Sequence, residues 1–363
     1  MTNAPRLTKI KSALALICAI TLSTPSFAAD NHQHIAPAIS YILSIEDILS
    51  DLDITDPFYF SNTSGNCSDY ARVYEALVND VQNETEFNMG VTITNTDTEC
   101  TLTANTIPNH NFNATGNFAT TIAEIERTYT IPISPELIDT SNPTELSQQA
   151  FNAVFLNGVP LDLLSAGCYD PENDMADASG HVQINCTPDE NDWMLDPLFM
   201  GGGFGSDEHN AHTQPDGTYH YHGNPKALFE NNDFENVPDS VSPVIGFASD
   251  GFPIYGTYIN DNGVIRQAIS GYELKAGSRG ETSTTNPGGN HDGTYVADWE
   301  FTNVGDLDEC NGMTVNGQYG YYVTNGYPWV MACHSGTPDD SFSKGGGNAG
   351  GNGGGNGGGR PPL

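Results

Sequence analysis

The sequence concentrates imidazole side chains in one short segment. Four of the ten histidines lie within fourteen residues, namely His209, His212, His220 and His222. His220 and His222 alternate with Tyr219 and Tyr221, so on a strand both imidazoles would project from one face and both phenol rings from the other. Two such imidazoles stand about 6–7 Å apart at their Cβ atoms, a separation that one metal ion bridges. We interpret the segment as a metal site.

The loop before this strand supplies further candidate ligands. His209 and His212 follow Asp207 and Glu208, and a Pro-Asp-Gly turn at 215–217 would fold this loop back over the strand. Imidazole combined with carboxylate suits Zn, Cu, Fe or Ni, whereas the lack of free thiolate and of clustered Met disfavours a Cu(I) site. We expect a transition metal, Cu or Zn, as cofactor, with Asp207 and Glu208 supporting the ligands or, in a catalytic site, acting as general base. The alternative is that the histidines form hydrogen bonds within a polar, loop-rich core.

The elements that must position these residues are predicted to be short strands. From about residue 100 the chain alternates apolar runs with Gly, Pro, Asn and Asp, and the clearest runs are 129–133, 153–156 and 244–248. We predict a mainly β domain with long loops over residues 100–337. Asp250 begins a tight turn in this domain, where it is either a structural turn residue or an acceptor that orients a ligating histidine.

The preceding segment, 29–99, predicts a small α+β region. Apolar residues recur at helical spacing over 36–52, and Ser68-Asp69 resembles the N-cap of a second helix that runs through Val81. Thr-rich alternation at 91–94 and 101–103 predicts two strands at the junction with the β domain.

The two ends of the chain have compositions unlike a folded core. Residues 1–28 combine a basic start, an apolar run of about ten residues and a small-residue cleavage site, as in a signal peptide. Residues 338–363 end in a Gly- and Asn-rich stretch that predicts a disordered tail. No later segment has the pattern of a transmembrane helix. We therefore expect a secreted, periplasmic or cell-surface protein.

The charge of the chain excludes one class of partner. Lys and Arg number 11 against 46 Asp and Glu, a net charge of −35. Such a surface repels phosphate backbones and anionic lipids, so binding to nucleic acid is not expected. The acidity either keeps an exported protein soluble or concentrates cations near its surface.

The cysteines predict disulfide bonds. Six remain after the predicted signal peptide, an even number that in an exported chain argues for disulfides, and six cysteines allow 15 pairings. Proximity favours Cys67–Cys100, Cys168–Cys186 and Cys310–Cys333, although a crossed arrangement stays open. No catalytic cysteine is expected.

A degenerate repeat surrounds the histidines. The segment 207–222 aligns with 308–322, and the two share Asp, Glu, Asn, Thr, Gly and two Tyr residues. All four histidines are replaced in the second copy, by Cys310, Met313, Gly320 and Tyr322. The pattern predicts two similar loop-and-strand units, of which only the first carries the metal ligands.

Several blocks of the β domain resemble the YHYH-domain family, a group of largely exported proteins whose activity is not established. The similar blocks follow one another in order at 107–110, 157–160, 216–223, 245–256, 291–295 and 307–312. The resemblance covers about residues 100 to 336. It implies that His110 joins the candidate metal ligands.

No motif names a reaction. The H-E-x-x-H motif, the G-x-S-x-G elbow and a phosphate-binding loop are all missing. The leading hypothesis is an exported metal-binding protein, and whether it is an enzyme stays open. The rivals are a non-catalytic structural or adhesive surface protein and a protein of metal storage or delivery.

Overall fold

The computed structural model describes residues 61–139, 142–198, 204–228 and 240–345. This part of the chain is β-rich and contains no helix of seven residues or more, as the mainly β prediction requires. The predicted signal peptide, the helix over 36–52 and the Gly-rich end of the tail lie outside the described residues. None of the described helices is long and apolar enough to cross a membrane.

The first sheet has four antiparallel strands in chain order. They are β1 (Val73–Asp80), β2 (Thr85–Asn95), β3 (Glu99–Ala104) and β4 (Arg127–Pro132). Strands β2 and β3 contain the predicted strands at 91–94 and 101–103, and β4 covers all but the last residue of the predicted strand at 129–133. Because β3 spans the predicted boundary between residues 99 and 100, strands on both sides of that boundary belong to one sheet.

The predicted helix from Ser68 through Val81 is wrong. A 3-10 helix, η1 (Cys67–Tyr70), is capped by the Asn66 side chain, and the chain then continues as the strand β1. Tyr74, Ala76 and Val78 are buried while their neighbours are more exposed, which is the two-residue period of a strand. The few apolar positions fit both a helical and a strand spacing, and the hydrogen-bonded pairing with β2 stabilises the strand.

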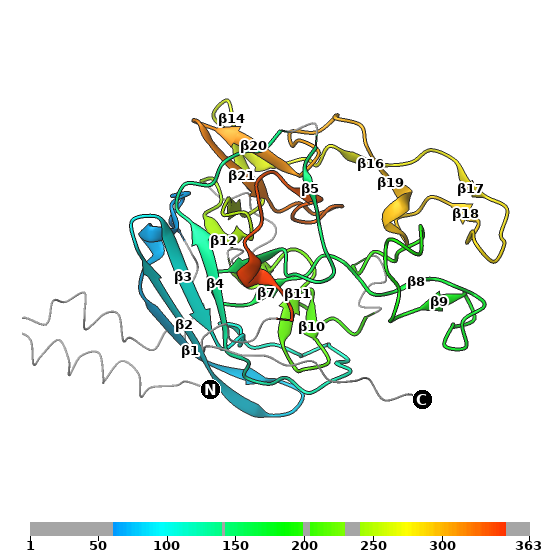
Figure 1. Cartoon of the computed structure of the whole chain (residues 1–363), viewed down its shortest axis with the longest axis horizontal. Coiled ribbons are helices and arrows are strands. Elements are labelled where there is room, and N and C mark those ends of the chain that lie inside the picture. Colours follow the sequence, from blue (N-terminus) through cyan, green and yellow to red (C-terminus); the bar gives the residue numbers. More distant parts are fainter. Residues whose placement is uncertain (1–60, 140–141, 199–203, 229–239, 346–363) are drawn as a thin grey trace, which may run out of the picture. The chain divides into compact units, whose positions relative to one another are not determined.

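The second sheet has eight strands in the order β10-β11-β7-β6-β12-β13-β21-β20. Its strands are β6 (Ala153–Phe155), β7 (Pro160–Leu161), β10 (Ala211–Thr213), β11 (Tyr219–Tyr221), β12 (Val244–Ala248), β13 (Pro253–Tyr255), β20 (Gly312–Val315) and β21 (Gln318–Tyr322). Two pairs are parallel, β11 with β7 and β13 with β21, and the other neighbours are antiparallel. Figure 1 shows β1 to β4 beside the row formed by β12, β7, β11 and β10.

The eight-stranded sheet consists of two equivalent halves. At its centre β6 pairs with β12, and Val154 lies opposite Phe247. The β6–β7 hairpin turns at Gly158 (φ 78°) and the β12–β13 hairpin at Gly251 (φ 89°), in the same hydrogen-bond pattern. The pattern of parallel and antiparallel pairs is therefore the same from either edge, with a pseudo-two-fold axis at the Val154–Phe247 pair.

The repeat found in the sequence forms the outer hairpins of these halves. Strands β10 and β11 come from the first copy, and β20 and β21 from the second. Asp207 accepts a hydrogen bond from the Tyr219 hydroxyl at 2.9 Å, and Asp308 accepts one from Tyr319 at the same distance. The two copies thus share a fold and not only a composition.

Shorter strands and 3-10 helices complete the described chain. The two-stranded pairs are β14 (Tyr258–Asp261) with β15 (Val264–Gln267), β16 (Tyr272–Leu274) with β19 (Trp299–Phe301), β17 (Ser278–Gly280) with β18 (Gly289–Asn290), β5 (Thr144–Glu145) with β22 (Cys333–His334), and β8 (Cys168–Tyr169) with β9 (His181–Val182). The further 3-10 helices are η2 (Lys226–Leu228), η3 (Val296–Asp298) and η4 (Asp340–Phe342).

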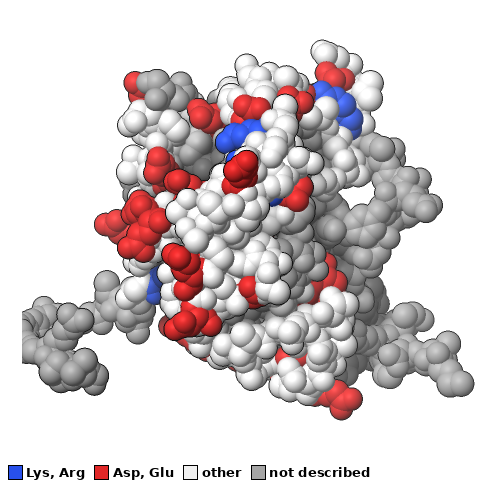
Figure 2. Space-filling view, turned by 90° about the vertical axis from the view of Figure 1, so that its right-hand side faces the viewer, with Lys and Arg blue, Asp and Glu red and all other residues white. Residues whose placement is uncertain are grey.

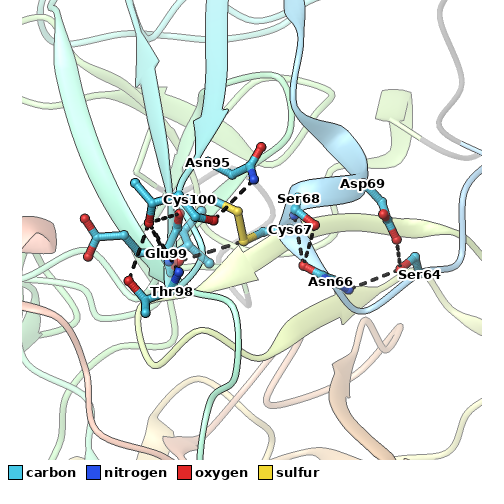
Figure 3. The surroundings of a disulfide bond; sticks show 11 residues. Ser64, Asn66, Cys67, Ser68, Asp69, Asn95, Thr98, Glu99 and Cys100 are labelled. Atoms are coloured by element: carbon cyan, nitrogen blue, oxygen red, sulfur yellow. Dashed lines mark hydrogen bonds between the residues drawn. A yellow bond between two sulfur atoms is a disulfide. The ribbon is translucent and has the colours of Figure 1, made fainter.

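Three disulfides cross-link the described part of the chain. They join Cys67 to Cys100, Cys168 to Cys186 and Cys310 to Cys333, which confirms the pairing by proximity. The first ties η1 to the start of β3, beside the Asn66 cap (Figure 3). Each closes a loop of 18 to 33 residues and so lowers the conformational entropy of the unfolded chain.

The tyrosines of β11 face the core. Tyr219 and Tyr221 are fully buried, and Tyr219 packs on Phe112 while Tyr221 packs edge-on against Phe155. The alternation of the strand then places His220 on the opposite face of the sheet. On the outer surface Asp and Glu outnumber Lys and Arg, as one face shows in Figure 2.

The close packing between the two sheets predicts that an added methyl group at Gly158 lowers the stability of the fold. A methyl group at Gly158 would lie 2.3 Å from the Ala104 Cβ and 2.7 Å from the Val91 Cγ2, whereas a methyl at Gly263 would meet nothing within 4 Å. Both glycines have positive φ, so Gly263→Ala measures the backbone cost alone, about 1–2 kcal/mol. Gly158→Ala should cost about 1–3 kcal/mol more because of overpacking. Urea unfolding under oxidising conditions measures both, and equal costs would contradict this packing.

Candidate metal centre

The hairpin of β10 and β11 brings three histidines together. His212 lies directly opposite His220 in the antiparallel register, and His222 follows β11 on the same face as His220. The Nε2 atom of His222 is 2.9 Å from that of His212 and 3.1 Å from that of His220. Ligand atoms of all three lie within 4.8 Å of one another. His220 and His222 are buried and His212 is partly buried.

In two of the rings, the hydrogen bond of the Nδ1 atom determines which nitrogen carries the proton. The Nδ1 of His212 donates to the backbone oxygen of Phe204, and the Nδ1 of His220 donates to that of Thr218. A carbonyl accepts only from N–H, so in the neutral rings both Nε2 atoms carry lone pairs. The Nε2 of His222 carries at most one proton and can donate to only one of them. A cation at the point where the three nitrogens meet would satisfy all of them.

Burial keeps the three rings neutral. It lowers the pKa of His212, and it lowers those of His220 and His222 well below the ordinary value. The positive charge that each ring would carry adds to the effect on its neighbours. Neutral imidazole is the form that binds metal ions.

The fold adds a charged pair that the sequence did not reveal. Asp162 follows β7, which pairs in parallel with β11, and its backbone N–H donates to the backbone oxygen of Tyr221. Its buried carboxylate accepts from Lys344 Nζ and from Gln214 Nε2, both at 2.7 Å. Lys344 lowers the pKa of His220 and of His222, so its positive charge acts on the centre. No local pattern connects residues 162 and 344 with 220.

Two of the predicted ligands are not in this cluster. The Nε2 atom of His110 is 2.7 Å from the hydroxyl of Tyr221, on the opposite face of β11. The His209 ring lies 4.0 Å from the His110 ring, and its Nε2 donates to the backbone oxygen of Asn111. Burial and the neighbouring His209 lower the pKa of His110 to about 3. The structure thus divides the five predicted ligands into a cluster of three and a separate pair.

The predicted carboxylates organise loops. Asp207 accepts from the backbone N–H groups of Asn113 and His209 as well as from Tyr219. Glu208 accepts from the backbone of Ala114 and lies 3.4 Å from His209. Both residues therefore support the loop before β10, and neither hydrogen-bonds to the three clustered histidines.

Asp250 also has structural partners. It accepts hydrogen bonds from the Tyr321 hydroxyl at 2.5 Å and from the backbone of Gly336 at 2.9 Å. Its equivalent in the first half is Asn157, which donates to the Tyr221 hydroxyl. No histidine is oriented by Asp250 among the described contacts.

The second half shows what replaces the cluster. Tyr322 stands where the first half has His222, and it stacks on Tyr255 at a ring distance of 5.0 Å. Met313 packs against this pair, and Gly320 leaves room for the Tyr255 ring. An apolar cluster thus takes the place of three imidazoles on the same backbone.

The geometry fits a metal ion. Three imidazole nitrogens bound tetrahedrally at about 2.0–2.1 Å from Zn²⁺ lie about 3.3–3.4 Å from one another. The two separations from the Nε2 of His222, 2.9 and 3.1 Å, are within a few tenths of an ångström of that value, and all three ligand atoms lie within 4.8 Å of one another. All described cysteines are in disulfides, so the set is nitrogen-only and suits Zn²⁺ or Cu²⁺.

Fold and site together define a disulfide-linked β protein with a buried three-histidine centre. The family model described as YHYH protein matches residues 128–336, more than half of the chain, and the chain belongs to this family. The family's tetrapeptide is the segment Tyr219–His222, which holds two of the three clustered histidines. Neither a curated protein nor a solved structure matched the chain.

The lowered pKa values make a prediction about stability in the metal-free protein. The unfolded histidines bind protons near pH 6.5 and the folded ones only at lower pH, so the free energy of unfolding must fall as pH drops below about 6.5. Replacing His220 by Gln should remove about 1.4 kcal/mol per pH unit from this slope between pH 6 and 5. Urea unfolding with a chelator present measures the slopes. Equal slopes would contradict a neutral, buried His220.

Proposed function

We propose that this protein binds one divalent transition metal ion, Zn²⁺ or Cu²⁺, through the Nε2 atoms of His212, His220 and His222. The observation that carries the proposal is the convergence of three nitrogens, two of them held as lone-pair donors by outward hydrogen bonds. Backbone acceptors of this kind orient metal-binding histidines in general. A hydrogen-bonded cluster without metal would leave the lone pair of His212 or of His220 without a donor, because His222 can donate to only one of them.

We further propose that the protein works outside the cytoplasm. Three disulfides persist in an oxidising compartment, and the leader-like segment 1–28 would direct the chain there. The net charge of −35 would raise the local concentration of cations around the molecule.

Three protein ligands leave a coordination position for water or for another molecule. Sites that keep such a position are typical of catalytic zinc, where the ion polarises the bound group. Asp162, held by Lys344, follows β7, and its backbone N–H donates to the backbone oxygen of Tyr221, the residue before His222. It would balance part of the charge of the ion.

The second candidate is a structural histidine cluster without metal. Either nitrogen separation, 2.9 or 3.1 Å, is also that of an N–H···N hydrogen bond, and the Nε2 of His222 could donate one such bond in a protein that serves as a surface scaffold. Metal content separates the two candidates directly.

Metal binding is tested by substitution on both faces of β11. The mature protein, purified without chelator, should contain about one metal ion per chain by elemental analysis. His212→Ala, His220→Ala and His222→Ala should each lower the affinity by more than the roughly 10–100-fold that residues around a ligand contribute. The matched controls His110→Ala and His209→Ala should retain the metal. Wild-type protein that binds neither Zn²⁺ nor Cu²⁺ would overturn the proposal.

The charged pair beside the centre should tune the affinity in opposite directions. Asp162→Asn leaves Lys344 unbalanced and should weaken metal binding by about 10–100-fold. Lys344→Gln removes a positive charge that acts on the histidines and should strengthen it. Lys275→Gln is a control, since that ammonium donates to a backbone oxygen elsewhere in the fold. Calorimetric titration with Zn²⁺ measures all three, and the same direction of change for both partners would contradict the electrostatic role.

A further inference from the structure

A cavity lies near the end of the parallel strands from which Asp162 and His222 extend. This apolar cavity of about 220 Å³ opens beyond the carboxyl end of β7, where Leu163 and Leu164 form part of its wall. Most of its wall is apolar or aromatic, including Leu146, Leu163, Leu195, Tyr327, Trp329 and Met331. Cavities that bind small molecules are mostly apolar and concave, as this one is.

The cavity adjoins the histidine cluster through two chain connections. Leu163, in its wall, follows Asp162 directly. Gly223 follows His222, and a methyl group there would come within 3.3 Å of the Trp329 Cβ. Trp329 of the wall thus lies against the residue that follows the proposed ligand His222, although none of the three clustered histidines lines the cavity itself.

The wall also selects by charge. Glu145 and Asp196 are its acidic members, and no Lys or Arg lines it in the described part of the chain. Asp196 accepts from the Trp329 Nε1 at 3.1 Å, which holds the indole ring in place. An anionic ligand would lose its hydration without gaining a cationic partner.

The size of the cavity limits the ligand to one or two rings. An apolar cavity of about 150 Å³ takes up benzene. A volume of about 220 Å³ has room for somewhat more, and flat rings pack well against aromatic side chains such as Tyr327 and Trp329 in the wall.

We propose that this cavity binds a small uncharged aromatic molecule, of the size of a phenol or an indole, and holds it close to the histidine centre. The cavity itself is independent of the metal, whereas the placement of the ligand beside an ion rests on the proposed function. The molecule would be the substrate or the modulator of the centre.

The first test uses metal-free protein and three probes: p-cresol, indole and benzoate. Ligand-observed NMR titration should show binding of the two neutral probes and at least about tenfold weaker binding of benzoate. Ala332→Phe, which fills the cavity, should abolish binding, and Leu164→Trp is a second filling variant if the first is unfolded. Val264→Phe, at a residue outside the cavity lining and 63% exposed, is the matched control and should bind as wild type. Absence of binding by both neutral probes, or binding unchanged by filling, would overturn the cavity proposal.

The second test places the ligand relative to the ion. The probe resonances should broaden strongly with Cu²⁺-loaded protein and not with Zn²⁺-loaded protein, because only Cu²⁺ is paramagnetic. Equal line widths with both metals would overturn the placement while leaving the cavity site standing. Elemental analysis of the same samples shows separately whether the metal is bound, so a failure of the proposed function is distinguishable from a failure of this inference.

Discussion

The parallel pairing of β11 with β7 is the interaction on which the centre depends. It fixes Tyr221 opposite Leu161 with both side chains in the core. The two-residue period of a strand then turns His220 and His222 to the other face, where β10 adds His212. A shift of one residue in this register would exchange the imidazoles with the phenol rings. The buried tyrosines therefore position the histidines.

The same strand separates two groups of polar residues. On the core side, Tyr221 joins Asn157 and His110 in a hydrogen-bonded group, and His209 stacks next to it. On the other side, three imidazole nitrogens converge. Because Tyr221 stands between His220 and His222 in the chain, a shift of its backbone would also move both histidines.

The features that could be predicted from the sequence depend on interactions between residues that are close in the chain, and the features that could not depend on distant residues. The shared face of His220 and His222 is a property of a single strand, and the fold-back of His212 follows from one turn, so local spacing was sufficient for both. Asp162 and Lys344 reach the centre by pairing across more than 50 residues, which leaves no local pattern. The strand β1 was predicted as a helix because its short apolar set fits both periods, and only its partner strand distinguishes them. His209 and His110 were grouped with the other histidines by proximity and by family resemblance, neither of which specifies a face.

The register at the middle of the eight-stranded sheet suggests an origin of the domain from two copies of one half. Because Val154 faces its own counterpart, Phe247, the contact between the halves has the self-complementary form of an interface between identical subunits. A chain with one half alone would have the edge of β6 unpaired, and a second copy of that chain could complete the sheet. In such an ancestor each subunit would carry its own histidine cluster. After fusion of the two subunits into one polypeptide, only one half would need to keep the histidine cluster. The apolar packing of Met313 and Tyr322 in the second half agrees with such a loss.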